Sequence, residues 1–389
     1  MPGKETSSHR PWLGRVAVVS LLIATSLIAV AQDVRAAATI RIPADFATLA
    51  EAVDAAEPGD TILVAPGTYP GGVRVFTPDL KVVSEAGPAL TILDLDPHPG
   101  RITVDSEATG FKIEGFTIEG ADTSNAIDSV AGDTIVRNNT FARNYTGSGS
   151  IVEMRLGGTI RSNLFTGNSC YAVAELDNSA LFVNNLVVNN PNCGGVEVGE
   201  GSVEVVNNTF VGNDFALHLE ETTGELRNNI VHDNRYSVSL NAPAYPVGLH
   251  TNLFWDSPPY DEQDDPAGWN GNIAADPRLS VNKPGLLGYG LKPSSPAIDA
   301  GVSGGLPATD FFGGIRKVDG DGDGAAKVDL GAIEYMSGIA SLSGSAAYPS
   351  GHPAYAACVN LWLDDGGLVS TTEVDADGGY AFVAPAGMY

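Results

Sequence analysis

The chain has 389 residues, with 47 Asp and Glu against 21 Lys and Arg, so its formal net charge is −26. This charge argues against nucleic acids and anionic membrane surfaces as partners, because both are bound through Lys and Arg. A hydrophobic share of 43% with only 17% charged residues is typical of a globular chain, and 46 Gly and 24 Pro indicate many tight turns, which favours β structure.

The first 38 residues have the pattern of an export signal. Lys4, Arg10 and Arg15 form a positive region before an apolar run at 16–30, and small residues suited to cleavage follow up to residue 38. The alternative is a transmembrane anchor, but the run is shorter than the roughly 20 residues that span a bilayer. We therefore predict an extracytoplasmic protein, secreted or on the cell surface, with no transmembrane span after signal removal.

Helical periodicity at 46–56 predicts a short amphipathic helix before a first strand at 61–65. A repeat follows, in which an apolar or aromatic residue lies two positions after each Asn and an apolar residue lies three positions before it. The aligned asparagines, separated by 24, 22, 23, 21 and 23 residues, are Asn139, Asn163, Asn185, Asn208, Asn229 and Asn252.

This period predicts coils of three short strands that stack in parallel, about 4.8 Å apart. The stacked asparagines would bond one another at a turn, where Asn also tolerates the left-handed backbone. A leucine-rich repeat is the alternative, but the chain lacks its leucine spacing and helical segments. We predict an all-β, right-handed, three-stranded parallel β-helix (a solenoid) over 39–257, with the helix at 46–56 covering its open end.

Both ends of this region carry specific motifs. Segments 42–49, 59–62 and 66–69 resemble the first coil of exported right-handed parallel β-helix proteins with a pectate-lyase-like fold, and 295–301 and 329–335 resemble their exit segment. The resemblance covers residues 39 to about 335 and implies the architecture. It implies no particular chemistry, because this fold hosts lyases, hydrolases, adhesins and binding proteins.

A second column of equivalent positions lies between the Asn turns. Apolar neighbours flank each member, so strand alternation points the column outward: Asp128, Glu153, Glu175, Glu197, His218 and Ser239. The next outward column is Val130, Arg155, Asp177, Gly199, Glu220 and Asn241. Stacked carboxylates repel, so we expect at least one of them to retain a proton or to share a cation.

Three interpretations of this face stay open. It is a solvated acidic surface, a Ca²⁺ site made by Glu153, Glu175, Asp177 and Glu197, or a catalytic surface. A hydrolase would use two carboxylates as acid and base, and a lyase would use Ca²⁺ with Arg155 or His218 as base. The candidate catalytic residues are Glu153, Arg155, Glu175, Asp177, Glu197 and His218. The site residues of neither enzyme family can be carried over residue by residue.

Two further features concern binding and oxidation. The loop from Trp255 to Tyr260, with the acids after it and Trp269, forms either a sugar-stacking lip or a cap on the last coil. Cys170 and Cys193 follow their asparagines by 7 and 8 residues, which places them on adjacent coils and predicts a disulfide in an exported protein.

The segment 258–337 contains the strongest metal motif. Asp319, Asp321 and Asp323 alternate with glycines and Gly324 is sixth, which is the opening half of a Ca²⁺ loop. Position twelve is Leu330, so Asp329 or Glu334 would have to complete the ligand set. We predict a structural Ca²⁺ ion, with an acidic turn without metal as the alternative.

The last segment, 338–389, has short alternating runs separated by turn residues. It resembles the start of a carboxypeptidase-regulatory-like or collagen-adhesin-B-like β-sandwich, and we expect the sandwich to be incomplete. The leading functional hypothesis is a protein whose long face binds polysaccharide, a cell-surface glycan or another extended partner without catalysis. The alternative is a Ca²⁺-assisted polysaccharide lyase or glycoside hydrolase acting at the Glu153, Glu175 and Glu197 strand.

Overall fold

The computed structural model describes residues 36–96, 100–199, 201–220, 223–240, 248–260, 265–280, 285–305, 307–335, 339–345, 358–362, 368–373 and 379–385. The elements below all belong to the compact unit Ala37–Tyr389. The predicted export signal lies outside the described residues up to position 35. Among the residues that are described, no helix is both long and apolar enough to cross a membrane.

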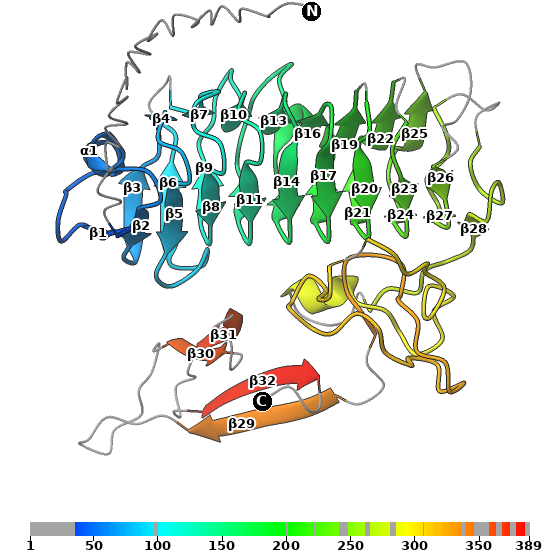
Figure 1. Ribbon diagram of the computed structural model, residues 1–389. Coiled ribbons are helices and arrows are strands. Elements are labelled where there is room, and N and C mark those ends of the chain that lie inside the picture. Colours follow the sequence, from blue (N-terminus) through cyan, green and yellow to red (C-terminus); the bar gives the residue numbers. More distant parts are fainter. Residues whose placement is uncertain are drawn as a thin grey trace, which may run out of the picture. The chain divides into compact units, whose positions relative to one another are not determined.

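Most of the chain winds into a solenoid with three parallel sheets, and each complete coil adds one strand to each sheet (Figure 1). Sheet A contains β1 (Thr39–Ile42), β2 (Thr61–Val64), β5 (Lys81–Ser84), β8 (Lys112–Glu114), β11 (Ile135–Arg137), β14 (Gly158–Arg161), β17 (Ala180–Val183), β20 (Glu204–Val206), β23 (Leu226–Arg227) and β26 (Leu249–His250). Sheet B contains β3 (Gly67–Pro70), β6 (Thr91–Asp94), β9 (Thr117–Glu119), β12 (Thr140–Ala142), β15 (Leu164–Thr166), β18 (Leu186–Asn190), β21 (Thr209–Asn213), β24 (Ile230–His232), β27 (Leu253–Trp255) and β28 (Ile273–Ala274). Sheet C contains β4 (Val73–Val75), β7 (Ile102–Val104), β10 (Ile127–Ser129), β13 (Val152–Met154), β16 (Ser169–Leu176), β19 (Asn192–Val198), β22 (Phe215–Leu219) and β25 (Tyr236–Leu240).

The predicted parallel β-helix is therefore confirmed. Its core consists of equivalent side chains that lie over one another from coil to coil. Phe141 pairs in register with Phe165, and their rings stack 4.7 Å apart. The inward column continues through Val187 and Phe210, all of them buried, because the side-chain period of two keeps each apolar residue on the inner face.

Buried asparagines form the turn between sheets A and B. In each rung the side-chain oxygen accepts from the backbone N–H of the preceding Asn, as Asn185 does from Asn163 at 2.9 Å. Its amide nitrogen donates to Asn208 Oδ1 at 3.2 Å and to the Ile160 carbonyl at 2.9 Å. The left-handed residue is the one before each ladder Asn, such as Asn184 with φ 56°, which corrects the sequence interpretation that placed it at the ladder Asn itself.

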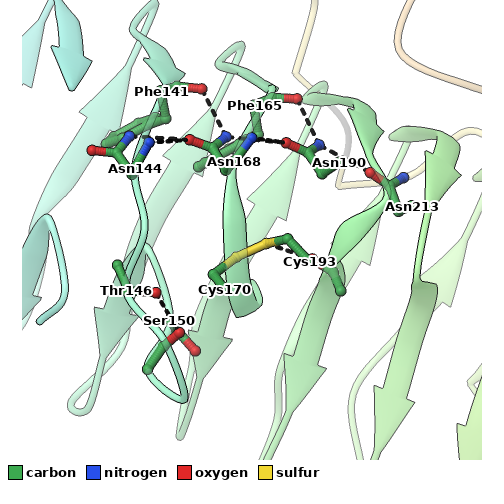
Figure 2. The surroundings of a disulfide bond; sticks show 12 residues. Phe141, Asn144, Thr146, Ser150, Phe165, Asn168, Cys170, Asn190, Cys193 and Asn213 are labelled. Carbon is green, nitrogen blue, oxygen red and sulfur yellow. Dashed lines mark hydrogen bonds between the residues drawn. A yellow bond between two sulfur atoms is a disulfide. The ribbon is translucent and has the colours of Figure 1, made fainter. Parts of the chain in front are cut away.

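A second asparagine ladder lies at the turn between sheets B and C (Figure 2). Each member follows a first-ladder Asn by five residues, and the set is Asn144, Asn168, Asn190, Asn213 and Asn234. Asn168 repeats the same bonding, since its amide donates to Asn190 Oδ1 at 3.1 Å and to the Phe141 carbonyl at 2.9 Å. The sequence signal of this ladder is its fixed five-residue offset from the first one, which the prediction of a single ladder did not use.

The helix α1 (Leu49–Ala55) closes the first coil. Thr48 and Glu51 form a capping box, and Leu49, Ala52 and Val53 are buried against the core. The helix contacts the edge strands β1 and β4, which agrees with the predicted covering role. However, β1 precedes the helix, so the first strand of the solenoid is Thr39–Ile42 rather than the expected strand at 61–65.

The segment after β28, which includes the 3-10 helix η1 (Gly285–Tyr289), folds back onto the outer face of sheet B. There Leu330 and Ala297 cover Ile230 and Leu253. Its central contact is Arg316, which is 2% exposed and donates to Asn184 Oδ1 at 2.6 Å and to Glu334 at 3.2 Å.

The last described strands form two antiparallel pairs. β29 (Ile339–Ser345) pairs with β32 (Gly379–Pro385), and β30 (Cys358–Trp362) pairs with β31 (Leu368–Glu373). The residues that connect these strands lie outside the described part of the chain. The β-sandwich therefore stays a prediction.

Candidate functional site

The outward face of sheet C brings the predicted carboxylates together in register. Glu153 pairs with Glu175, and Glu175 pairs with Glu197. Asp128 precedes this column and His218 follows it. The column arises because flanking residues such as Val152 and Ala174 are fully buried, so strand alternation turns the acids outward. Ser239 lies in the next rung.

Arg155 neutralises the beginning of this column. Its Nη2 lies 2.6 Å from Glu153 Oε1, and its Nε lies 3.4 Å from Asp128 Oδ1. These carboxylates raise the pKa of Arg155 against the effect of desolvation. An arginine held protonated in this way supplies a positive charge rather than a base.

The carboxylates farther along the column are less well balanced. Burial raises the pKa of Glu197 to about 7, with further contributions from Glu175, Glu220 and Asp177. Burial and the neighbouring Glu153 and Asp177 also raise the pKa of Glu175. Glu197 is therefore partly protonated near neutral pH, as the stacking of like charges at strand spacing leads one to expect.

Of the six candidate catalytic residues, the structure gathers two groups at opposite ends. Glu153 and Arg155 form one, with Asp128. Glu197 and His218 form the other, with Glu220, whose carboxylate completes a set of three ligand atoms within 4.8 Å of one another. Burial lowers the pKa of His218, so its imidazole is neutral at pH 7 and can offer a ring nitrogen to a metal.

Asp177 and Glu175 occupy the middle of the face. A Cβ on Gly199 would come within 2.1 Å of Asp177 Oδ1, so the Asp177 carboxylate lies over the adjacent glycine of the second column. Glu175 accepts a hydrogen bond from Ser150 at 3.4 Å. These two acids join the two end groups into one continuous strip.

Aromatic side chains lie beside the C-terminal end of this strip. Tyr171 is 38% exposed, and its ring centroid is 5.9 Å from that of Phe215 and 6.3 Å from that of His218. Tyr236 is the register partner of Phe215, and its ring centroid lies 5.0 Å from that of Tyr260, which is 65% exposed. These five residues are called the aromatic end below.

Most residues of the aromatic end are not among the predicted site residues. Phe215 and Tyr236 are separated by one repeat, which was a usable signal. Tyr171 lies at a point where β16 and β19 shift register, between Ser169 and Ala172. Gly194 then makes room for the Phe215 ring, since a Cβ there would come within 2.0 Å of it.

Cys170 and Cys193 form a disulfide between the adjacent strands β16 and β19, with Cα atoms 4.5 Å apart (Figure 2). The bond lies just after the second asparagine ladder and directly before Tyr171. It ties together the two coils that supply Glu175 and Glu197.

The acids of the Ca²⁺ motif separate into two environments. Asp319 and Asp321 lie with Asp299 within 4.8 Å, and Gly324 has φ 90°, as the turn requires. Asp323 Oδ1 accepts from the Ala325 backbone. Asp329 and Glu334 point inward instead. Asp329 accepts from the Asp299 and Tyr335 backbones, and Glu334 pairs with Arg316.

Comparisons with known proteins found one family match and distant similarities to solved structures. Residues 82–264 match the family described as "Periplasmic copper-binding protein (NosD)". Among solved structures, pectate lyase Pel9A is 14% identical with a TM-score of 0.38, over 73% of this chain and 90% of that chain. A mutant of the PL6 family alginate lyase AlyGC is 12% identical with a TM-score of 0.29, over 70% of this chain and 59% of that chain. No curated protein matches the sequence. These identities are too low to transfer site residues.

Proposed function

We propose that this chain is an extracytoplasmic β-helix protein that binds a neutral polysaccharide along sheet C without catalysis. The observation that supports it is the aromatic end beside the carboxylate strip. Partly exposed tyrosines offer flat apolar surface to the C–H faces of sugars, and the nearby carboxylates accept hydrogen bonds from sugar hydroxyls. An extended glycan also repeats at a length close to the coil spacing of about 4.8 Å, so successive sugars would meet successive coils.

The charge of the face narrows the ligand class. Glu153, Glu175, Glu197 and Glu220 outnumber the single cation Arg155 in the two outward columns, so a polyanion laid along them would be repelled. A neutral glycan avoids that cost. The extracytoplasmic location is supported by the periplasmic description of the matching family, by the predicted export signal and by the disulfide.

Glycan binding is tested with the purified chain and a panel of neutral and acidic polysaccharides. Tyr171→Ala should weaken binding of a neutral glycan about fivefold or more, which corresponds to about 1 kcal/mol for a buried aromatic contact. The matched control is Tyr69→Ala, which changes a tyrosine of β3 in sheet B, away from the aromatic end. Equal losses in both variants, or tight binding of polyuronates alone, would contradict the proposal.

Catalysis by the same face is the alternative function, favoured by the Glu197 pKa of about 7, which suits a general acid near neutral pH. New reducing or unsaturated ends, released by the native chain and lost in both Glu197→Gln and His218→Ala, would establish an enzyme. Release that survives both substitutions would point to a contaminant. If no glycan of the panel releases new ends, this result supports the binding function.

A metal is the second candidate ligand, at Glu197, His218 and Glu220. The match to a family described as copper-binding favours Cu²⁺ here, and imidazole with carboxylates suits that ion. His218→Ala should abolish Cu²⁺ binding measured by calorimetry. His250→Ala, which changes a histidine paired with Glu225 at 2.9 Å on sheet A, should leave it unchanged.

We also propose a structural Ca²⁺ ion at Asp299, Asp319 and Asp321, where oxygen ligands surround a glycine-rich turn. Ca²⁺ should raise the melting temperature more than Mg²⁺ at equal ionic strength, because only binding to the folded state stabilises it. Asp321→Asn should remove the difference between the two ions, whereas Asp256→Asn, an exposed acid after β27, should not.

A further inference from the structure

A recess of about 550 Å³ opens at the other end of sheet C, over β4 and β7. It is lined by Gly72, Arg74, Arg101, Thr103, Thr123 and Ser124. In a chain with a net charge of −26, the described residues of this lining include two arginines and three hydroxyl side chains and no carboxylate. Arg74 and Thr103 are register partners on adjacent strands, so both point outward at the same height.

The arginines are held from outside the recess. The Arg74 guanidinium lies 4.9 Å over the Phe76 ring, and its Nη2 lies 2.7 Å from Asp105 Oδ2. Arg101 Nη1 lies 3.5 Å from Asp128 Oδ2. A guanidinium has five N–H donors, so a pairing through one nitrogen leaves donors for a ligand. These ion pairs are solvent-exposed on the arginine side and therefore weak, so the N–H donors that point away from Asp105 and Asp128 stay available to a ligand.

Two hydroxyl residues at the recess are in unfavourable states. The Ser124 Oγ is buried and has no hydrogen-bond partner among the described residues. Thr123 has φ 59°, a left-handed conformation that a β-branched residue rarely adopts. Both states cost free energy in the unliganded chain. Rotation of the Ser124 side chain toward a ligand that bonds to its hydroxyl would recover part of that cost.

Gly72 sets the depth of the recess. A Cβ at this position would come within 3.0 Å of the Gly100 backbone, so a larger residue would fill the space between β4 and the segment before β7. The volume is within the range of sites for small molecules, which is about 300–1,000 Å³. It is therefore large enough for one sugar ring.

We propose that this recess binds an acidic sugar, with its carboxylate between the guanidinium groups of Arg74 and Arg101 and its hydroxyls on Thr103 and Ser124. Arginine suits a carboxylate because its planar fork matches the two oxygens. The site goes beyond the proposed neutral-glycan face, since it lies on β4 and β7, whereas the carboxylate strip and the aromatic end lie on the strands from β10 to β25. A short acidic sugar is compatible with the strip of carboxylates farther along, whereas a long polyuronate would have to cross it.

The test is calorimetric titration of the purified chain with glucuronate, glucose and glucose 6-sulfate. We expect glucuronate to bind and glucose to bind at least about tenfold more weakly, because a hydrogen bond to a charged group contributes about 1.5–3 kcal/mol. Glucose 6-sulfate that binds as tightly as glucuronate would retain an anion site but overturn the assignment to a carboxylate. Equal binding of glucose and glucuronate, or no binding of either anion, would overturn the site.

Variants decide whether the recess is responsible. Arg101→Gln should weaken glucuronate binding about tenfold or more, and Arg101→Lys should restore only part of it. The control Arg143→Gln changes an arginine on the sheet B side that is paired with Glu119, and it should have no effect.

Ser124→Ala should weaken binding without lowering the melting temperature, which separates a ligand contact from a structural one. Tyr171→Ala should leave glucuronate binding unchanged, so failure of the glycan proposal and failure of this one are distinguishable.

Discussion

At the scale of single residues, Asn185 shows how a buried polar side chain can hold a solenoid together. It accepts from the backbone and side chain of Asn163 and donates to Asn208 and to the Ile160 carbonyl. All four bonds are buried, and they connect three consecutive coils. A residue of this kind contributes through the groups it satisfies in its neighbours as much as through its own amide.

Asn185→Ala should lower the free energy of unfolding by about 2–5 kcal/mol, because it leaves the Asn163 N–H and the Ile160 carbonyl buried without partners. Urea unfolding measures the change. Asn138→Gly is the matched control, since Asn138 is exposed and left-handed with φ 55° and glycine keeps that conformation. A loss in the control as large as that in Asn185→Ala would contradict the ladder argument.

Glu197 predicts a specific pH dependence of stability. Its folded pKa of about 7 is raised above the ordinary value of 4.5, so the folded chain keeps a proton that the unfolded chain has lost. The stability linked to this proton is fully present below the unfolded pKa and is lost as the pH rises through about 7. Glu197→Gln should therefore unfold at a higher temperature than the native chain at about pH 8, with a smaller difference at about pH 4.

The control for that prediction is Glu107→Gln, which changes an exposed glutamate in the turn before β8. Melting temperatures are compared across the pH range at constant ionic strength. If the melting temperatures of Glu197→Gln and of the native chain change in parallel with pH, Glu197 does not hold the extra proton in the folded chain.

At the scale of elements, the disulfide between β16 and β19 closes a loop with a sequence separation of 23 residues. A cross-link over a loop of this length reduces the entropy of the unfolded chain and stabilises the fold by about 2–4 kcal/mol. The double variant Cys170→Ala and Cys193→Ala should have a free energy of unfolding lower by that amount, measured by urea unfolding. All variants carry Cys358→Ala, so that no third thiol is present. If reducing conditions leave the unfolding curve of the disulfide-containing chain unchanged, the prediction is contradicted.

The exit segment depends on one cation surrounded by acids. Arg316 is buried with Glu334, Asp310 and Asp329, and burial raises the pKa of Glu334 to about 9 and that of Asp329 to about 7. One guanidinium cannot balance three carboxylates, so protons remain on this cluster at neutral pH. The arrangement fastens the segment to Asn184 and to the backbone of Gly331 and Ala332.

Arg316→Met should destabilise the attachment of this segment by about 3–5 kcal/mol, because it leaves buried acids without their counter-charge. Hydrogen exchange should show faster opening of 307–335 than of sheet A, whose ladder bonds are untouched. The exposed pair of Arg41 and Glu85 provides the control, since Arg41→Met should change exchange little. Uniform acceleration in all three sheets would mean that the segment and the coils unfold as one unit.

At the scale of the whole molecule, the net charge of −26 acts on every coil. Repulsion between exposed carboxylates opposes the compact state and is screened by salt, as the Debye length falls from about 30 Å at 0.01 M to about 8 Å at 0.15 M. The melting temperature should therefore rise with NaCl over this range. A constant or falling melting temperature would show that local ion pairs such as Arg155 with Glu153 outweigh the general repulsion.

Sequence predicted the solenoid and its outward acidic column because both follow from one period. Once Asn163 and Asn185 are aligned, the position of Glu175 relative to Glu197 is determined by counting. Positions that break the period were not predictable in this way. Tyr171 lies at a local register shift, and Arg316 contacts Asn184 across 132 residues, a contact that no repeat encodes.

The Arg316 contact also bears on how the solenoid comes apart. Stacked coils contact only their neighbours, so a free end could peel away one turn at a time. Here the returning chain bonds Asn184, Asn207 and Asn228, which belong to three successive turns. Unfolding from the C-terminal end must therefore first break these hydrogen bonds across three turns. The last coils should consequently unfold together rather than one at a time.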